Sequence, residues 1–498
     1  MTTARSAGVH GSRELSAVPV RPVALIVLAQ VVLLTALSGR YGYHRDELYF
    51  RIAGEQLAWG YVDQPPLTPL LAKLSTAAFG DSLVGLRVVA SLLAAASVLV
   101  LVLIARELGG SRRALLLTAG CAAGSAIVFA LGHMLATASA DLFLWLLFSW
   151  LALRLLRTGD PRWFVPLGLV LGVGLLNKYL IGLLAFGLLV AVAIVGPRVV
   201  LRSSWFAGGA LLALAVAAPN LWWQIAHGWP QWEVAAGLAA EDGAENRALF
   251  VPLQLVYLSP LFVPVWVAGA IRVWRAPDLR WARSVVVAYV LLAGCVLALG
   301  GKSYYVLPLL LVLLAAGAEP AARRVPGRVL VAVVGVAAAV NAVATLPVLP
   351  PAALGPINAM NGEQGEQVGW EPLTATVADA WELIPAAQRE TALVYTTNYG
   401  EAGAVTRHGS AYGLPAAYSA HMSYADWGPP ADALSGPVVV VAHELNRAAR
   451  RYFTDCEFVA AIDNGYGLGN DEQGIWVRLC SGTTQPWSVL WPVLRHTS

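Results

Sequence analysis

The chain has 498 residues, of which 58% are hydrophobic and only 13% charged, and its mean hydropathy is +0.64. Soluble globular proteins carry roughly twice that charged fraction, so the composition excludes a cytosolic enzyme, a disordered chain and a small disulfide-rich secreted domain. The net charge of +3 is too small and too dispersed for nucleic-acid binding. The composition therefore predicts a polytopic α-helical membrane protein.

Eleven apolar segments are candidate membrane helices, because a helix needs about 20 apolar residues to cross a bilayer. In chain order they are 22–38, 83–105, 113–131, 139–156, 162–176, 179–196, 204–223, 250–273, 282–299, 304–318 and 328–347. The first span has no small-residue cleavage site and is followed by further spans, so it is not expected to be a signal peptide.

The placement of arginine predicts the orientation, because cytoplasmic loops are enriched in Lys and Arg. With the N-terminus in the cytoplasm, most basic residues before position 348 fall in inner segments. An odd number of spans then puts residues 348–498 outside the plasma (inner) membrane. The three lysines, Lys73, Lys178 and Lys302, fall on this outer side together with most loop acids. We therefore expect any site at the outer face.

The first outer loop, 39–82, carries the Asp46-Glu47 pair at the start of a helical pattern that runs to about Ala58. Acids near the N-terminal end of a helix are stabilising, so the pair either caps this helix on a wet surface or takes part in chemistry. Adjacent residues on a helix point in different directions, which predicts separate roles. The loop closes over a helical bundle and carries aromatic and basic neighbours, and this favours chemistry.

A third acid of this loop stands in the sequence Asp63-Gln64-Pro65-Pro66. The double proline keeps Gln64 and Pro65 out of a helix interior. Asp63 is therefore expected on a rigid turn, from which the prolines begin the next helical segment.

Three further charged residues are expected at the outer boundary of the bundle. Asp141 lies near the outer end of span 139–156. An ionisable side chain at a helix centre is unfavourable by at least roughly 2.5 kcal/mol, so a function or a partner is the default interpretation. Lys178 and Lys302 separate apolar runs at the same boundary. They either snorkel to the interface or neutralise a phosphate at the membrane surface.

From about Pro350 the composition becomes that of a soluble domain. Buried strands are predicted at 391–396, 436–442 and 475–479, and helices at 373–387 and 443–452, which together predict a small extracytoplasmic α/β domain.

The chain also contains four cysteines and one glycine-rich tract. Cys456 and Cys480 are compatible with a disulfide outside the membrane and equally with two free thiols. Cys121 and Cys295 lie in spans and are expected to be apolar packing residues. The tract 463–472 does not follow the EF-hand spacing, so an ordered turn is favoured over a calcium loop.

Taken together, these motifs resemble the integral-membrane glycosyltransferases of the GT-C superfamily that use polyprenyl-phosphate sugars. Within it the chain is most similar to glycosyltransferase family 39, which includes protein O-mannosyltransferases and aminoarabinose transferases. The resemblance rests on Asp46-Glu47, Asp63-Gln64-Pro65-Pro66, Asp141, Asn177-Lys178-Tyr179 and Lys302-Ser303-Tyr304-Tyr305. It covers about residues 20–320. It implies a catalytic transmembrane domain at 1–347 and a second domain at 348–498.

The resemblance also implies a reaction, the inverting transfer of a sugar from a lipid-phosphate donor. Asp46 matches the general base of the family, and Glu47 would position the acceptor or the base. Lys178, Lys302 and Arg45 would stabilise the departing phosphate, and Tyr304 and Tyr305 accompany Lys302.

A divalent metal is a further implication of the resemblance, since in some relatives acids at the positions of Asp63 and Asp141 bind one. Two carboxylates make an incomplete metal site, so His44 or His133 would have to contribute. Gln64 stands where a lysine can follow the acid in relatives, which shifts the phosphate-binding role onto the other lysines. No Walker motif or Rossmann fingerprint occurs, and no nucleotide cofactor is expected.

The expected partners are a polyprenyl-phosphate-linked sugar, membrane lipids and a protein, glycan or lipid acceptor that the sequence leaves open. The alternative function is a transporter or flippase of a lipid-linked glycan. Against it, the acids cluster at one face rather than at the bilayer midplane, and the two halves of the chain show no repeat. A scaffold that only displays the outer domain would leave the ordered acids unexplained.

Overall fold

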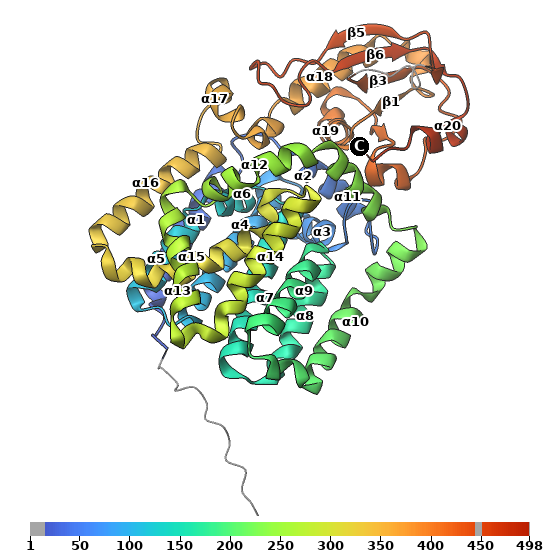
Figure 1. The fold of residues 1–498 in the computed structure, drawn as a ribbon. Coiled ribbons are helices and arrows are strands. Elements are labelled where there is room, and N and C mark those ends of the chain that lie inside the picture. Colours follow the sequence, from blue (N-terminus) through green and yellow to red (C-terminus); the bar gives the residue numbers. More distant parts are fainter. Residues whose placement is uncertain (1–14, 444–450, 498) are drawn as a thin grey trace, which may run out of the picture.

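The computed structural model describes residues 15–443 and 451–497 and consists of a helical bundle with a small α/β domain on one end (Figure 1). We call the end of the bundle under the α/β domain the capped end. This architecture confirms the prediction of a polytopic helical protein with a small C-terminal α/β domain.

In the described residues, seven helices are long and apolar enough to cross a membrane, and two bent helix pairs bring the number to as many as nine. The seven are α1 (Val20–Leu37), α4 (Leu83–Glu107), α7 (Thr137–Thr158), α10 (Ser204–Ala226), the segment Pro277–Leu299 that contains α14 (Arg283–Leu299), the segment Ser303–Arg324 that contains α15 (Leu307–Arg324), and α16 (Gly327–Thr345). The predicted spans 162–176 and 179–196 correspond to two shorter apolar helices, α8 (Phe164–Leu175) and α9 (Leu180–Val195). All eleven predicted segments are therefore helical, although not all have the length of a full span.

Two of the predicted spans, 113–131 and 250–273, are wrong as continuous helices. The first is divided into α5 (Arg112–Ala123) and α6 (Ala126–His133), which are bent by 55° at the break. The second is divided into α12 (Gly243–Val256) and α13 (Val263–Arg275), with a bend of 69°.

These two breaks contact each other, which explains why an apolar environment tolerates them. The amide of Ile127 donates to the carbonyl of Tyr257 at 2.9 Å. The side-chain amide of Asn341 in α16 donates to the carbonyls of Gly124 and Leu258, at 2.8 and 2.9 Å. A backbone group freed in a lipid environment must find a partner inside the protein. The two interrupted helices and Asn341 provide these partners for each other.

The loop between α1 and α4 contains two short helices at the capped end. The first, α2 (Arg45–Glu55), confirms the helical pattern predicted from Asp46, although it ends three residues before Ala58. The second, α3 (Leu67–Phe79), begins directly after Pro66, as expected from the double proline.

The α/β domain is built on a five-stranded sheet in the order β2-β1-β3-β6-β5. Its strands are β1 (Leu393–Thr396), β2 (Tyr418–Ser419), β3 (Val438–Ala442), β5 (Glu457–Ala461) and β6 (Trp476–Cys480). β1 pairs in parallel with β2 and β3, whereas β6 is antiparallel to both of its neighbours. The predicted strands are confirmed as β1, β3 and β6.

The other predictions for this domain had different outcomes. The helix predicted at 373–387 is confirmed as α18 (Trp370–Glu382), whereas the helix predicted at 443–452 lies mostly at 444–450, outside the described residues. Cys456 and Cys480 form a disulfide between the start of β5 and the end of β6. Cys121 and Cys295 are free thiols in α5 and α14. The tract 463–472 is an ordered turn, in which Asn464 accepts hydrogen bonds from the amides of Tyr466 and Leu468.

The α/β domain rests on the first loop through α19 (Tyr399–His408), which packs against α2. Two glycines of α19 make this close approach possible. A Cβ atom on Gly400 would lie 2.9 Å from Cβ of Arg45, and one on Gly403 would lie 2.7 Å from Cβ of Leu48. Larger residues at these positions would push the two helices apart. The side chains of α2 thus share one hydrophobic cluster with the α/β domain.

Candidate active site

His44 caps α2 and fixes the directions of its first two acids. The amide of Asp46 donates to Nδ1 of His44 at 3.2 Å, and the amide of His44 donates to Glu47 at 2.9 Å, which completes a reciprocal cap. Successive residues on a helix point about 100° apart. Asp46 and Glu47 therefore enter different surroundings.

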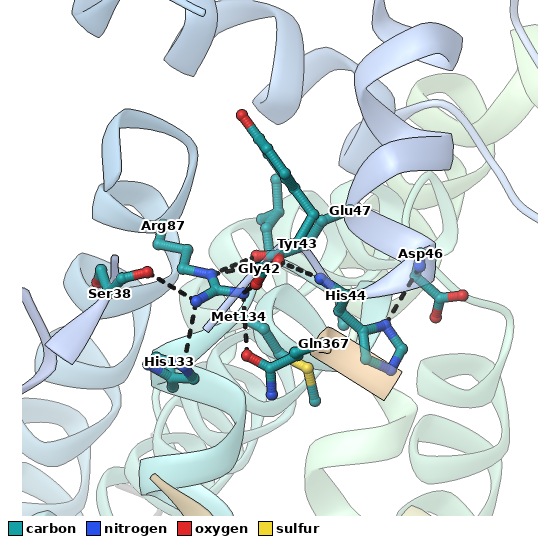
Figure 2. A network of polar contacts seen from close by, with 12 residues as sticks. Ser38, Gly42, Tyr43, His44, Asp46, Glu47, Arg87, His133, Met134 and Gln367 are labelled. Atoms are coloured by element: carbon teal, nitrogen blue, oxygen red, sulfur yellow. Dashed lines mark hydrogen bonds and ion pairs between the residues drawn. The ribbon is translucent and has the colours of Figure 1, made fainter. Parts of the chain in front are cut away.

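Glu47 lies in a fully buried ion pair with Arg87 of α4 (Figure 2). Nη2 of Arg87 is 2.7 Å from Oε2, and its Nε donates to Oε1 at 3.0 Å. The amide of Leu135 also donates to Oε1 at 3.0 Å. Both carboxylate oxygens of Glu47 are thus occupied, and the side chain holds α2 in place without facing an open space.

The remaining donors of Arg87 connect this ion pair to four other segments (Figure 2). They reach the carbonyls of Ser38 and Gly42 at 2.7 and 2.9 Å and Oε1 of Gln367 at 3.1 Å. Nε2 of His133 lies 3.2 Å from Nη1. His133, a candidate metal ligand from the sequence, therefore faces a guanidinium, whose positive charge opposes the binding of a cation.

Asp46 lies on the other side of the first turn and is only half buried. Its Oδ1 accepts a hydrogen bond of 2.8 Å from the hydroxyl of Tyr399, the first residue of α19. The acid that the sequence assigns as the base is thus contacted by the α/β domain.

Asp63 is held in a similar way by a tyrosine of α2. The hydroxyl of Tyr49 donates to Oδ1 of Asp63 at 2.5 Å. Burial raises the pKa of Asp63 to about 6, against the opposing effect of the hydrogen bond from Tyr49, and the charge of Asp46 adds to the increase. The two carboxylates are therefore neighbours.

Aromatic rings of the α/β domain cover this pair of acids. The ring of Tyr49 lies 4.9 Å from that of Tyr399, 6.2 Å from Tyr424 and 5.9 Å from Trp427. Aromatic rings at such separations attract each other, and this attraction adds to the stabilisation that comes from burying their apolar surface. These rings form one side of the site. Within it the hydroxyl of Tyr49 donates to Asp63, and the hydroxyl of Tyr399 donates to Asp46.

Lys178 lies between α8 and α9, and its ammonium contacts two aromatic rings. Nζ is 4.7 Å from the ring centre of Tyr305 and 5.5 Å from that of Tyr304, distances typical of cation–π contacts. The preceding Asn177 is buried, accepts from the hydroxyl of Thr68 at 2.9 Å and donates to the carbonyl of Thr137 at 2.9 Å. Asn177 thus connects α3 to α7, and these two hydrogen bonds fix the position of the adjacent Lys178.

Asp141 is buried on the first turns of α7, and the charge of Lys178 acts on it. Its Oδ1 has no hydrogen-bond partner among the described residues. The structure therefore brings together Asp141, Lys178, Tyr304 and Tyr305, which the sequence predicted at one boundary of the bundle.

Glu363, in the segment that precedes α18, connects this group to the start of α2. Its Oε2 lies 3.1 Å from Nε2 of His44. This hydrogen bond outweighs desolvation and, with the charges of His44, Arg45 and Lys302, lowers the pKa of Glu363 to about 2. The charge of Glu363 also acts on Tyr304. Asp46, His44 and the two lysines consequently lie around one region of the capped end.

Two of the predicted phosphate ligands already have acidic partners. Lys302 is half exposed, and its Nζ is 3.9 Å from Oδ2 of Asp242. Arg45 forms an ion pair with Asp471 and lies 3.7 Å from Glu366. Arg45 thus has less positive charge to offer to a phosphate than Lys178, which contacts two neutral rings and has one acidic neighbour, Asp141.

The predicted metal site does not fit the side chains that the structure brings together. Among residues 15–443 and 451–497, no group of three His, Cys, Asp or Glu side chains could hold a metal ion. Asp63 accepts from Tyr49, His44 is shared between its helix cap and Glu363, and His133 faces Arg87. We derive no step of the chemistry through a metal.

Sequence reasoning missed four residues that organise the site, namely Arg87, Glu363, Gln367 and Tyr399. Arg87 could have been found, because a guanidinium inside an apolar span calls for a partner by the rule that was applied to Asp141. Glu363, Gln367 and Tyr399 carry no comparable signal, since each stands in an ordinary polar stretch far along the chain from its partner.

Comparison with known proteins gives one family match and several similar folds. Residues 63–223 match the family described as dolichyl-phosphate-mannose-protein mannosyltransferase. The chain is also similar to ArnT from Cupriavidus metallidurans, with TM-scores of 0.57 for its crystal structure with undecaprenyl phosphate and 0.56 for the apo state. In both cases the identity is 14%, and the match covers 92% of this chain and 97% of ArnT.

A second similar fold is that of the arabinofuranosyltransferase AftD from Mycobacteria, with a TM-score of 0.52 and 14% identity. This match covers 95% of the chain and 41% of AftD. No curated protein matches the sequence. The resemblance to GT-C glycosyltransferases that the motifs indicated is confirmed by the family match and by the shared fold.

Proposed function

We propose that the chain transfers a sugar from a polyprenyl-phosphate donor to an acceptor hydroxyl or amine, with inversion at the anomeric carbon. The observation that carries this proposal is the half-buried carboxylate of Asp46 on the same end of the bundle as the ammonium of Lys178. It is supported by the fold shared with ArnT, whose crystal structure contains undecaprenyl phosphate.

In this reaction Asp46 is the general base. It accepts the proton of the acceptor as the acceptor atom bonds to the anomeric carbon, while the bond from that carbon to the phosphate oxygen breaks on the opposite face. The departing polyprenyl phosphate gains negative charge, which Lys178 and Lys302 stabilise. A positioned general base contributes typically 10²–10⁴-fold to a rate.

The reaction takes place at the outer face of the membrane, with the N-terminus in the cytoplasm. Two observations support this orientation. The disulfide between Cys456 and Cys480 is typical of an oxidising compartment, and the inner loops of the predicted topology are arginine-rich. Alkaline phosphatase fused after the α/β domain should then be active in cells, whereas an inactive fusion would reverse the orientation.

The central test is Asp46→Asn, which keeps the shape of the side chain and removes its basicity. Purified protein is assayed with radiolabelled polyprenyl phosphates that carry mannose, aminoarabinose or arabinofuranose, with the membrane fraction of the host as acceptor. We expect at least one donor to be used by the unmodified chain and its transfer to fall by about 10²–10⁴-fold in the variant. Asp379→Asn, on an exposed position of α18, is the matched control.

Each alternative outcome is informative. Full activity of Asp46→Asn would exclude this residue as the base. If the unmodified chain transfers none of the three sugars, glycosyl transfer from these donors is not its function. Translocation of a fluorescent lipid-linked sugar across vesicles would then decide in favour of a transporter.

A further inference from the structure

Among the described residues, one oxygen of the Asp46 carboxylate has a hydrogen-bond partner and the other has none. Oδ1 accepts the hydroxyl of Tyr399 at 2.8 Å, and among the described residues this is the one hydrogen bond made to the carboxylate group. Oδ2 remains available to an acceptor. We infer that Tyr399 of the α/β domain is a positioning residue, which orients Asp46 so that Oδ2 faces the acceptor; this inference rests on the proposed role of Asp46 as the base.

The ring of Tyr399 is held tightly enough to orient another side chain. It lies between Tyr49 and His421, with ring centres 4.9 Å apart in each case. The amide of Tyr399 donates to Nδ1 of His421 at 3.4 Å, and His421 stacks on His496 at 4.7 Å. The hydroxyl of Tyr399 thus has a fixed position relative to the sheet.

The place of Tyr399 in the α/β domain is also that of a functional residue. It stands three residues after the end of β1, whose neighbours β2 and β3 run parallel to it, and His421 stands two residues after the end of β2. Residues at the carboxyl ends of parallel strands are the usual site residues of α/β sheets. Here the carboxyl ends of β1 and β2 face α2. The end of the sheet at which site residues are usually found therefore lies next to Asp46.

Asp46 is consequently fixed from two directions. On the side of the helical bundle, the buried ion pair of Glu47 and Arg87 anchors the helix that carries Asp46. On the side of the α/β domain, Tyr399 holds the carboxylate of Asp46. Asn398 caps α19 by accepting the amide of Gly400 at 2.7 Å, so the first turn that presents Tyr399 is itself well defined. The α/β domain is then part of the catalytic unit.

The test is Tyr399→Phe, which removes the hydroxyl and keeps the ring in its stack. A misplaced reacting group can lower a rate by up to about 10²-fold. We expect kcat to fall by about 10–100-fold, with the KM for the donor and the melting temperature nearly unchanged. The probes are the three radiolabelled polyprenyl-phosphate sugars named above.

Tyr395→Phe is the matched control. Tyr395 is buried in β1 of the same domain, where its ring packs against Phe453 and Trp487 in a hydrophobic cluster separate from that of α2. Loss of its hydroxyl should leave kcat unchanged. An equal fall of kcat in both variants would mean that the hydroxyls act through packing and would overturn the inference, as would unchanged kcat in Tyr399→Phe.

A double variant separates this inference from the proposed function. If Tyr399 acts through Asp46, adding Tyr399→Phe to Asp46→Asn should cause no further loss. An independent further loss would contradict the inference. If Asp46→Asn is inactive and Tyr399→Phe behaves as the unmodified chain, the base assignment stands and the positioning role fails. If Asp46→Asn is fully active, the assignment of Asp46 as the base fails, and this inference fails with it.

Discussion

Asp46 and Glu47 are adjacent in the sequence, and their surroundings are opposite. Glu47 is fully buried, and both of its oxygens are occupied by Arg87 and backbone amides. Asp46 is half exposed, with one hydrogen bond from Tyr399 among the described residues and one oxygen free. Two adjacent positions in the first turn of one helix therefore carry an acid that holds the structure and an acid that is available for chemistry.

This difference shows how a motif can combine stability with reactivity. A base must lie in a fixed position and still keep a free lone pair, which one carboxylate cannot achieve if all of its lone pairs accept hydrogen bonds. In this protein Glu47 fixes the helix, and Asp46 is carried on it. The following changes test this division of roles, from the largest expected effect to the smallest.

The largest effect is expected for Glu47→Gln, which leaves Arg87 buried without its counter-ion. Loss of one partner of a buried ion pair destabilises a protein by about 3–5 kcal/mol. We expect a clear fall in the melting temperature in detergent and loss of activity as a consequence of misfolding. Glu55→Gln, at an exposed position of the same helix, is the control.

The pair can also be replaced as a whole. Glu47→Leu combined with Arg87→Met should recover much of the melting temperature, since buried pairs can be exchanged for apolar residues with little loss. A Glu47→Gln variant that is stable but inactive would contradict the comparison, because Glu47 would then act in the chemistry.

A smaller effect is expected for Lys178→Met, which retains the length of the side chain and its contacts with Tyr304 and Tyr305. A hydrogen bond to a charged group contributes about 1.5–3 kcal/mol, so the KM for the donor should rise by about 10–100-fold while the melting temperature stays the same. Lys73→Met, at an exposed position of α3, is the control. Equal effects of the two substitutions would remove Lys178 from the donor site.

The smallest effect is expected for Asp63→Asn and depends on pH. Burial raises the pKa of Asp63 to about 6 in the folded protein, above the value of 3.8 for a solvated carboxyl. The protonated form is thus favoured by folding, and the stability that it contributes is lost as the pH rises through about 6. Asparagine cannot ionise, so the gain in melting temperature of the variant over the unmodified chain should be a few degrees at pH 8, about half as large at pH 5 and small below pH 4.

The same pH comparison on Asp379→Asn should show no difference, because that side chain is exposed. An equal gain at every pH would mean that the ionisation of Asp63 is not what destabilises its surroundings.

The sequence predicted those features that depend on local pattern. Apolar runs located the helices and three strands, and the acids at the start of α2 and the prolines before α3 defined the loop. It also identified Lys178 and Asp141 as unusual charges at one boundary, and the structure brings them together. Composition and spacing were sufficient for these features because each is determined within a few residues.

The features that were missed depend on contacts between distant residues. The hydrogen bond of Tyr399 to Asp46 joins residues 353 positions apart, and the helix breaks near Gly124 and Leu258 are stabilised by Asn341. An apolar pattern is the same for a straight helix and for a broken one whose freed amides find partners elsewhere. The role of Glu47 became clear only with Arg87, which lies 40 positions further along.

The distances along the chain from Asp46 to Tyr399 and from Glu47 to Arg87 determine when each contact can form during synthesis. Glu47 and its partner emerge from the ribosome close together in time, so the first two spans can lock the α2 loop early in membrane insertion. Tyr399 is synthesised hundreds of residues later, after the last span. A nascent chain therefore has Asp46 in a stable loop but without its contact to Tyr399, and the proposed catalytic unit is completed only when the α/β domain has folded onto that loop.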